Sequence, residues 1–342
     1  MIQMMKQRDS NMELLRIITM CMIVILHLDI FLLEEPGYFN KASTSYYFIL
    51  FVNSLTIIGV NVFIMLSGWY GIKLKWNRFI ELWFQVFFFI AIGLICNFIF
   101  TGQMIPIKEL LSHVFLMSGS DYGFFQSYIL LYIFSPLLNQ YAELASKKAF
   151  TTFLSVFFLI QLVWGCLSWG YVYFGNGYSA ISYMGIYLLA RFAKIYHWGN
   201  HIKSDQWFFI YLLLTILGST LAFTGGRHNH TIYNIAYSYA SPFVVLASFA
   251  FLYFFSTLKL RNRVVNWIAK HCFAVYLFHM NIFILPHIIQ ICQNYGADKS
   301  LSIFCLIAIL TCIFIFTISI LLDMCRLSLW NFLLGIIKSI TR

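Results

Sequence analysis

Two ionisable side chains, Arg16 and His27, lie within an apolar stretch, residues 11–33, that is long enough to cross a bilayer. Eleven positions separate them, so on an α-helix they differ by about 20° around the axis and by about 16 Å along it. One helix face would then carry a permanent cation near one end of the stretch and a titratable base deeper inside. Because ionisable groups at membrane depth cost several kcal/mol, their default interpretation is functional.

The separation between Arg16 and His27 is close to the length of a pantetheine arm. A nucleotide phosphate could therefore meet the guanidinium while a thioester reached the imidazole, a base suited to proton transfer or nucleophilic catalysis. Each residue also has a structural explanation. Arg16 could extend its side chain to lipid headgroups, and His27 could be a hydrogen-bonded polar residue between helices.

The composition is that of a helical membrane protein. Of 342 residues, 61% are hydrophobic and 10% are charged, whereas a soluble domain carries about 25% charged residues. We therefore expect an all-α, polytopic transmembrane bundle forming a single domain over residues 1–342. The first stretch does not fit a cleavable signal peptide, because it is too long, contains Arg16 and lacks a small-residue cleavage site. The eight cysteines lie in or beside apolar runs without a CxxC pair, so no metal site is expected.

The hydropathy pattern predicts about ten spans. Their approximate ranges are 11–33, 45–70, 79–101, 123–143, 149–169, 180–197, 206–224, 236–257, 271–292 and 301–324.

The positive charges predict the orientation of these spans. With the N-terminus in the cytoplasm, 17 of the 22 Lys and Arg residues fall on the inner side and only Lys41, Lys108, Arg227 and Lys299 on the outer side. By the positive-inside rule, both termini should lie in the cytoplasm and the protein in the cell membrane. The net charge of +10 is then a topology signal, and nucleic acid is not an expected partner.

Several segments around the first span could position or assist the two residues. The second span ends in small residues, including Gly59, Ser67 and Gly68, which let helices approach closely. The first cytoplasmic loop carries cations that suit either topology or the phosphates of a cytoplasmic cofactor, namely Lys73, Lys75 and Arg78.

Three other segments carry structural signals. Pro136 should kink the fourth span and free carbonyls that need partners inside the protein. The amphipathic stretch at residues 104–117 is too short and too charged to span. In the ninth span, Tyr276 and His279 share one helix face, and Pro286 should bend the helix near its outer end.

Four motifs occur in a characteristic order: Arg16-x10-His27, then FIMLSGWY closing the second span, YGFFQSYILLYIFSPLLN opening the fourth and FAVYLFH in the ninth. Together they make the chain resemble the acyltransferase-3 family of integral membrane O-acyltransferases along nearly its whole length, in the stand-alone form. The resemblance implies transfer of an acyl group, usually acetyl from acetyl-CoA, to a surface polysaccharide, a lipid-linked glycan or another sugar acceptor. It ties catalysis to His27 and Arg16. The family's FFxLSG segment is matched cleanly only at Ser67 and Gly68.

The resemblance suggests a mechanism in which acetyl-CoA enters from the cytoplasm. Its phosphates would be held by Arg16 and the loop cations Lys73, Lys75 and Arg78, with Ser67 also near the donor. His27 would then either take the proton of a sugar hydroxyl or carry the acetyl group itself, with His279 orienting it.

Two other functions fit a chain of about ten spans. A transporter or flippase for a lipid-linked glycan explains the buried polar groups, and a membrane partner without chemistry makes His27 dispensable. Acetyl-CoA consumption that depends on a sugar acceptor would distinguish the enzyme from both. The sequence leaves the acceptor, the acyl group and the oligomeric state open.

Overall fold

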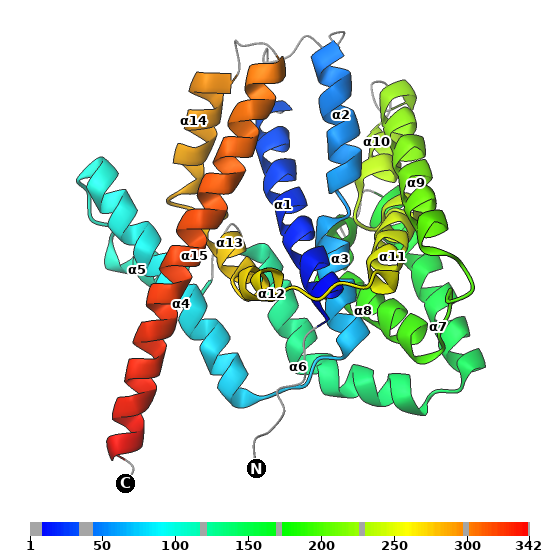
Figure 1. Ribbon diagram of the computed structural model, residues 1–342, viewed down its shortest axis with the longest axis horizontal. Helices are drawn as coiled ribbons and strands as arrows, with labels where there is room; N and C mark the ends of the chain where they lie inside the picture. The colour runs from blue at the N-terminus through cyan, green and yellow to red at the C-terminus, as the bar shows by residue number, and fades with distance from the viewer. Residues whose placement is uncertain are drawn as a thin grey trace. The chain divides into compact units, whose positions relative to one another are not determined.

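The computed structural model describes residues 9–33, 44–116, 122–168, 173–225, 230–296 and 301–340, and these are helical with no β-strand among them (Figure 1). Internal contacts divide the chain into two compact units. Unit 1 is Met1–Leu74 with Phe124–Asn266, and unit 2 is Lys75–Gly123 with Trp267–Arg342. The predicted all-α fold class is confirmed for the described residues, while the single domain stays a prediction.

Most of the chain lies in helices, from the single turn η2 to the 40-residue α15. In chain order they are α1 (Ser10–Leu33), α2 (Thr44–Thr56), α3 (Gly59–Tyr70), α4 (Trp76–Thr101), α5 (Ile107–Val114), α6 (Gly123–Leu144), α7 (Lys147–Ile160), the π-helix η1 (Gln161–Leu167), the 3-10 turn η2 (Gly175–Gly177), α8 (Ala180–Ile195), α9 (Ser204–Gly225), α10 (His230–Tyr237), α11 (Pro242–Thr257), α12 (Arg263–Ala269), α13 (Cys272–His279), α14 (Leu285–Gly296) and α15 (Leu301–Ile340).

Seven helical segments within the described residues are long and apolar enough to cross a membrane. They correspond to seven of the ten expected spans. The other three expected spans fall on α6, on the 16-residue α8 and on α13 with α14. The chain is thus a multi-pass membrane protein, while the count of ten and the cytoplasmic termini stay predictions.

The second span is two helices, not one. The chain turns at Ile57 and Ile58 between α2 and α3, so carbonyls near the break lose their helical partners. The Tyr211 hydroxyl donates to the Leu55 carbonyl at 2.9 Å. A side chain of α9 therefore supplies a donor that hydrocarbon cannot.

Pro136 frees a carbonyl within α6, as the sequence predicts, while the predicted kink stays a prediction. Proline has no N–H, so the carbonyl four residues earlier, at Tyr132, loses its helical donor. The buried Ser135 hydroxyl donates to that carbonyl at 2.7 Å. The freed acceptor is therefore satisfied within the same helix turn, and α6 continues to Leu144.

Glycines set the spacing of the helices around α1 in unit 1, where α1 packs against α2, α3 and α11 (Figure 1). A Cβ at Gly59 would lie 2.5 Å from Ile23 Cγ1 of α1. A Cβ at Gly68 would lie 2.3 Å from the Tyr187 carbonyl oxygen and 3.0 Å from Ala190 Cβ, both on α8. The predicted close approach at these small residues is confirmed, and it brings α3 against both α1 and α8.

Gly68→Ala should lower stability by about 1–3 kcal/mol, because the added methyl meets backbone that cannot rotate away. Gly335→Ala is the matched control. A Cβ at Gly335 in α15 would meet nothing within 4 Å, so the helix should gain about 0.5–1 kcal/mol. Thermal unfolding of both variants in detergent measures the difference, and equal midpoints would refute the close-approach argument.

In unit 2, the expected ninth span is broken between α13 and α14. Asn281 occupies the break and donates to the Phe89 carbonyl at 2.8 Å and to the Tyr122 hydroxyl at 3.0 Å. Its Oδ1 accepts the Phe283 N–H at 3.0 Å. The expectation that Pro286 bends this span was wrong. Proline is the second residue of α14, where its missing N–H costs nothing.

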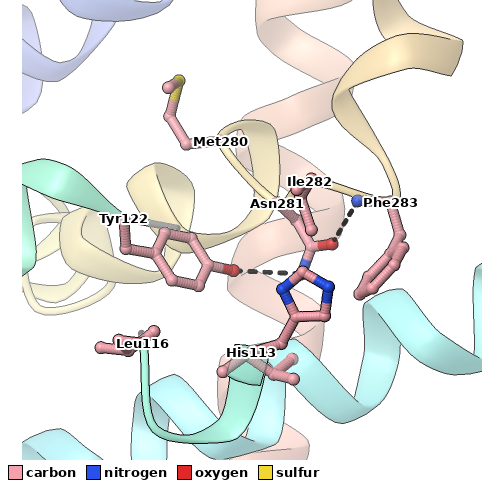
Figure 2. A pocket seen from close by; sticks show the side chains of 8 residues that line it. His113, Leu116, Tyr122, Met280, Asn281, Ile282 and Phe283 are labelled. Carbon is pink, nitrogen blue, oxygen red and sulfur yellow. Dashed lines mark hydrogen bonds between the residues drawn. The ribbon is translucent and has the colours of Figure 1, made fainter. Parts of the chain in front are cut away.

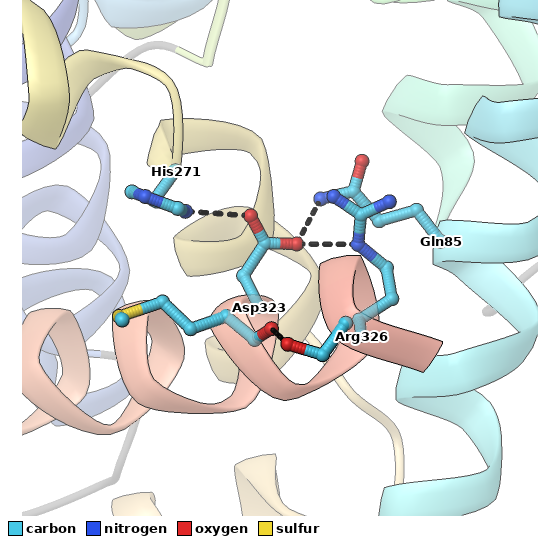
Figure 3. A network of polar contacts seen from close by, with 6 residues as sticks. Gln85, His271, Asp323 and Arg326 are labelled. Carbon is cyan, nitrogen blue, oxygen red and sulfur yellow. Dashed lines mark hydrogen bonds and ion pairs between the residues drawn. The ribbon is translucent and has the colours of Figure 1, made fainter. Parts of the chain in front are cut away.

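Unit 2 also contains a buried charged network that joins three helical segments (Figure 3). The Asp323 carboxylate on α15 accepts from Arg326 Nε at 2.6 Å and from Gln85 Nε2 of α4 at 2.9 Å. His271, just before α13, lies 2.7 Å away through Nδ1. The Asp323 side chain is 1% exposed, and those of His271 and Arg326 are 4% exposed. Since a carboxylate only accepts in this arrangement, His271 Nδ1 carries the proton.

The helix α15 is longer than the sequence analysis predicts. Its 40 residues correspond to about 60 Å, twice the thickness of the hydrocarbon core. The expected tenth span ends at residue 324, whereas the helix continues to Ile340. The reason is local, because residues 326–340 contain no proline and only one glycine.

Candidate functional site

Arg16 and His27 lie on one uninterrupted helix, α1, and both are half-buried in unit 1. Because the helix has no break between them, the predicted separation of about 16 Å along the axis and about 20° around it holds. The element that positions both residues is therefore a single rigid rod, packed against α3 and α11.

The Arg16 guanidinium is held by an acidic neighbour one turn earlier on the same helix. Glu13, which is buried, forms an ion pair with Arg16 Nη1. The sequence analysis missed this pair, although i, i+3 acid–base spacing is a signal for it. The pair fixes the direction of the guanidinium and offsets its charge within the bundle.

A hydroxyl pair from two other helices lies near Arg16. Ser67 Oγ of α3 donates to the Phe63 carbonyl at 3.2 Å, and it lies 3.3 Å from the Tyr128 hydroxyl of α6. Tyr128 and Arg16 are close enough to interact electrostatically. The structure thus pairs Ser67 with Tyr128, whose hydroxyl is within electrostatic range of Arg16. The sequence showed Tyr128 only as one of several polar residues in the fourth span.

The loop after α3 is fixed by a closed set of hydrogen bonds in unit 1. The Ile72 N–H donates to the Tyr187 hydroxyl at 2.9 Å, which donates to Asn139 Oδ1 at 2.6 Å. Asn139 Nδ2 donates to the Ile72 carbonyl at 2.7 Å, which closes the set. Gly71 begins the loop with φ +72°, a conformation that favours glycine. The loop is therefore held tightly by α6 and α8.

The three predicted loop cations are exposed. Lys73 ends this loop in unit 1, whereas Lys75 and Arg78 begin unit 2. Arg78 forms an ion pair with Glu81 at 2.9 Å, and its side chain is 71% exposed. Their role in holding a cofactor stays a prediction.

His279 is buried at the end of α13 in unit 2. Its Nδ1 lies 2.6 Å from the Val275 carbonyl oxygen, so that nitrogen carries the proton and Nε2 is an acceptor in the neutral ring. The Tyr276 ring lies 6.2 Å away, edge to face, which agrees with the predicted shared face. The catalytic role of His279 stays a prediction.

A small pocket beside this segment is too small for a sugar (Figure 2). Its volume is about 10 Å³, room for one water. The two labelled groups that meet in it, Tyr122 and Asn281, already bond each other and the backbone. The remaining lining includes His113 of α5 with Leu116 and Phe283. The residues that line this pocket therefore join α5 to the α13–α14 break.

The comparisons with known proteins agree with the four sequence motifs, which lie on α1, α3, α6 and α13. A family model of an acyltransferase domain, acyltransferase type 3, matches residues 9–324. No curated protein and no solved structure matches the chain. Because the matched residues include nearly the whole chain, this protein belongs to the acyltransferase-3 family.

Proposed function

We propose that this membrane acyltransferase moves an acetyl group from acetyl-CoA to a hydroxyl of a surface polysaccharide, a lipid-linked glycan or another sugar, with His27 at the reacting centre. The observation that carries the proposal is the unbroken helix α1, which aligns Arg16 and His27 about 16 Å apart. That distance matches a phosphate at one end of a pantetheine arm and a thioester at the other.

The donor would bind with its phosphates at the Arg16 end of α1. Arg16 supplies a guanidinium whose direction is fixed by Glu13, and guanidinium groups bind phosphate strongly. Ser67 and Tyr128 add hydroxyls beside it. Lys73, Lys75 and Arg78 would attract the polyanionic donor from the cytoplasm through their exposed charges.

In direct transfer, neutral His27 accepts the proton of a sugar hydroxyl while the hydroxyl oxygen bonds the thioester carbon. The carbon–sulfur bond then breaks, and the coenzyme leaves as a thiolate that takes the proton from the imidazolium. No net proton is released.

In a relay, His27 attacks the thioester first, and the acetyl group is held on its ring nitrogen until a sugar hydroxyl accepts it. In the first half-reaction the carbon–sulfur bond breaks, and the coenzyme thiolate takes the proton of the other ring nitrogen, which leaves neutral N-acetylimidazole. In the second, the hydroxyl oxygen bonds the acetyl carbon, the carbon–nitrogen bond breaks, and the hydroxyl proton goes to the released imidazolate and restores neutral His27.

The decisive experiment combines purified protein with labelled acetyl-CoA and the isolated surface glycan. We expect the label to move to the glycan, and free coenzyme to accumulate over many turnovers only when the acceptor is present. In a deletion strain, mass spectrometry of the glycan should show loss of one acetyl mass for each modified residue. A transporter or flippase would leave acetyl-CoA unconsumed, and that result would refute the proposal.

A further inference from the structure

Arg191 of α8 is a buried cation whose charge is poorly compensated. Its side chain is 13% exposed. Within the part of the chain that the structure describes, its guanidinium makes no hydrogen bond, and its Nε is buried without a partner. The nearest carboxylate, Glu143, is 3.6 Å away and 67% exposed. A buried charge normally has hydrogen-bonded partners, so this one requires an explanation.

The packing around Arg191 holds the guanidinium in place without neutralising it. The close approach of α3 to α8, at Gly68 and Ala190, brings the loop after α3 beside it. A Cβ at Gly71 would lie 2.9 Å from Arg191 Nη1 and 3.6 Å from Asn139 Oδ1. Any side chain at Gly71 would therefore fill the space at the face of the guanidinium.

A chain of polar side chains within unit 1 leads from Arg191 back to Arg16. The hydroxyls of Tyr187 and Tyr128 interact electrostatically with each other, and Arg191 acts on the first of them. Arg16 acts on the second. Of the two guanidinium groups, from α1 and α8, only Arg16 has an acidic neighbour at ion-pair distance below 3 Å.

We infer that Arg191 binds a phosphate group of the acyl donor, as a second anion subsite in the same unit as Arg16. A planar guanidinium with several N–H donors and no hydrogen-bonded partner suits bidentate phosphate binding. The inference rests on the proposed function, because acetyl-CoA supplies the phosphate. A phospholipid headgroup has the same phosphate chemistry, so the test must distinguish these two sources.

The test compares donors with and without phosphate. For Arg191→Gln we expect kcat/KM for acetyl-CoA to fall about 10- to 100-fold, mostly through KM, as for loss of a charged hydrogen bond. With acetyl-pantetheine, which has no phosphate, wild type and Arg191→Gln should agree within about twofold. With acetyl-CoA, the kcat/KM of Arg191→Lys should lie between the values of wild type and Arg191→Gln. Lysine keeps the charge but lacks the planar set of N–H donors.

Two control variants separate this role from a structural one. Glu143→Gln removes the loose carboxylate and should not weaken acetyl-CoA binding. If Arg191 served only the ion pair, Glu143→Gln and Arg191→Gln would have equal effects. Lys203→Gln removes an exposed cation. If its kcat/KM for acetyl-CoA fell as much as that of Arg191→Gln, the effect of Arg191 would be only general electrostatic attraction. Size-exclusion chromatography in detergent confirms that each variant is folded.

Each outcome decides a separate question. If wild type transfers acetyl and Arg191→Gln has an unchanged KM for acetyl-CoA, the inference fails and the proposed function stands. If wild type neither binds nor consumes acetyl-CoA, the proposed function itself fails. If Arg191→Gln instead loses only the higher activity that wild type has in phosphatidylcholine vesicles with added phosphatidylglycerol, the phosphate belongs to a lipid. That result overturns the coenzyme assignment.

Discussion

Replacing His27 by Gln is expected to lower acetyl transfer by about 10²- to 10⁴-fold, the range seen when a general acid or base is lost. Glutamine keeps a polar side chain of similar size but cannot accept and return a proton at neutral pH. The half-buried position on α1 should tolerate it, so the protein should still insert and fold. The measurement is transfer from labelled acetyl-CoA by purified protein, normalised to the folded fraction.

His201→Gln is the matched control, because His201 is an exposed histidine in the turn between α8 and α9. It should transfer at the wild-type rate. Incubation with acetyl-CoA in the absence of acceptor then distinguishes the two chemical routes. An acetylated peptide containing residue 27 supports the relay, and its absence in an active enzyme supports direct transfer. Wild-type transfer by His27→Gln would remove the central hypothesis.

Asp323→Asn is expected to destabilise the protein by about 3–5 kcal/mol, the usual effect of removing one partner of a buried ion pair. The amide is nearly isosteric with the carboxylate, so little packing is lost. The Arg326 guanidinium, which is 4% exposed, would be left as a buried charge without a counterion. Thermal unfolding in detergent should show a midpoint lowered by at least about 6 °C.

Glu81→Gln serves as the control for Asp323→Asn. It breaks another i, i+3 pair with arginine in the same unit, but Arg78 of that pair is largely exposed. Exposed pairs contribute about 0–1 kcal/mol, so the midpoint should barely move. Similar midpoints for the two variants would show that the Asp323 network contributes no more than a surface ion pair.

Hydropathy predicted where the helices lie but not where they break. A run such as residues 45–70 is apolar throughout, and nothing local marks the turn at Ile57. At the turn, Tyr211, 156 residues away along the chain, supplies a donor for the Leu55 carbonyl. The break before α14 depends similarly on Asn281 and on Phe89, 192 residues apart.

The predictable part of the candidate site is the part that lies on one helix. The relation of Arg16 to His27 needs only the helical repeat, so the sequence was sufficient. The contact of Ser67 with Tyr128 joins α3 to α6 across 61 positions, and no periodicity reports it. In the sequence, Arg191 is one more basic residue on the inner side and indicates only topology. Its lack of a hydrogen-bonded partner is a property of packing, so composition cannot reveal it.

The pairing of Glu13 with Arg16 on one turn of α1 also matters for biogenesis. A span that carried the arginine alone would present a net charge to the lipid as it enters the bilayer. Because acid and base are adjacent on the same segment, the segment can partition as a neutral dipole. The helix thus brings its own counterion, and its integration does not depend on a charged partner from another helix.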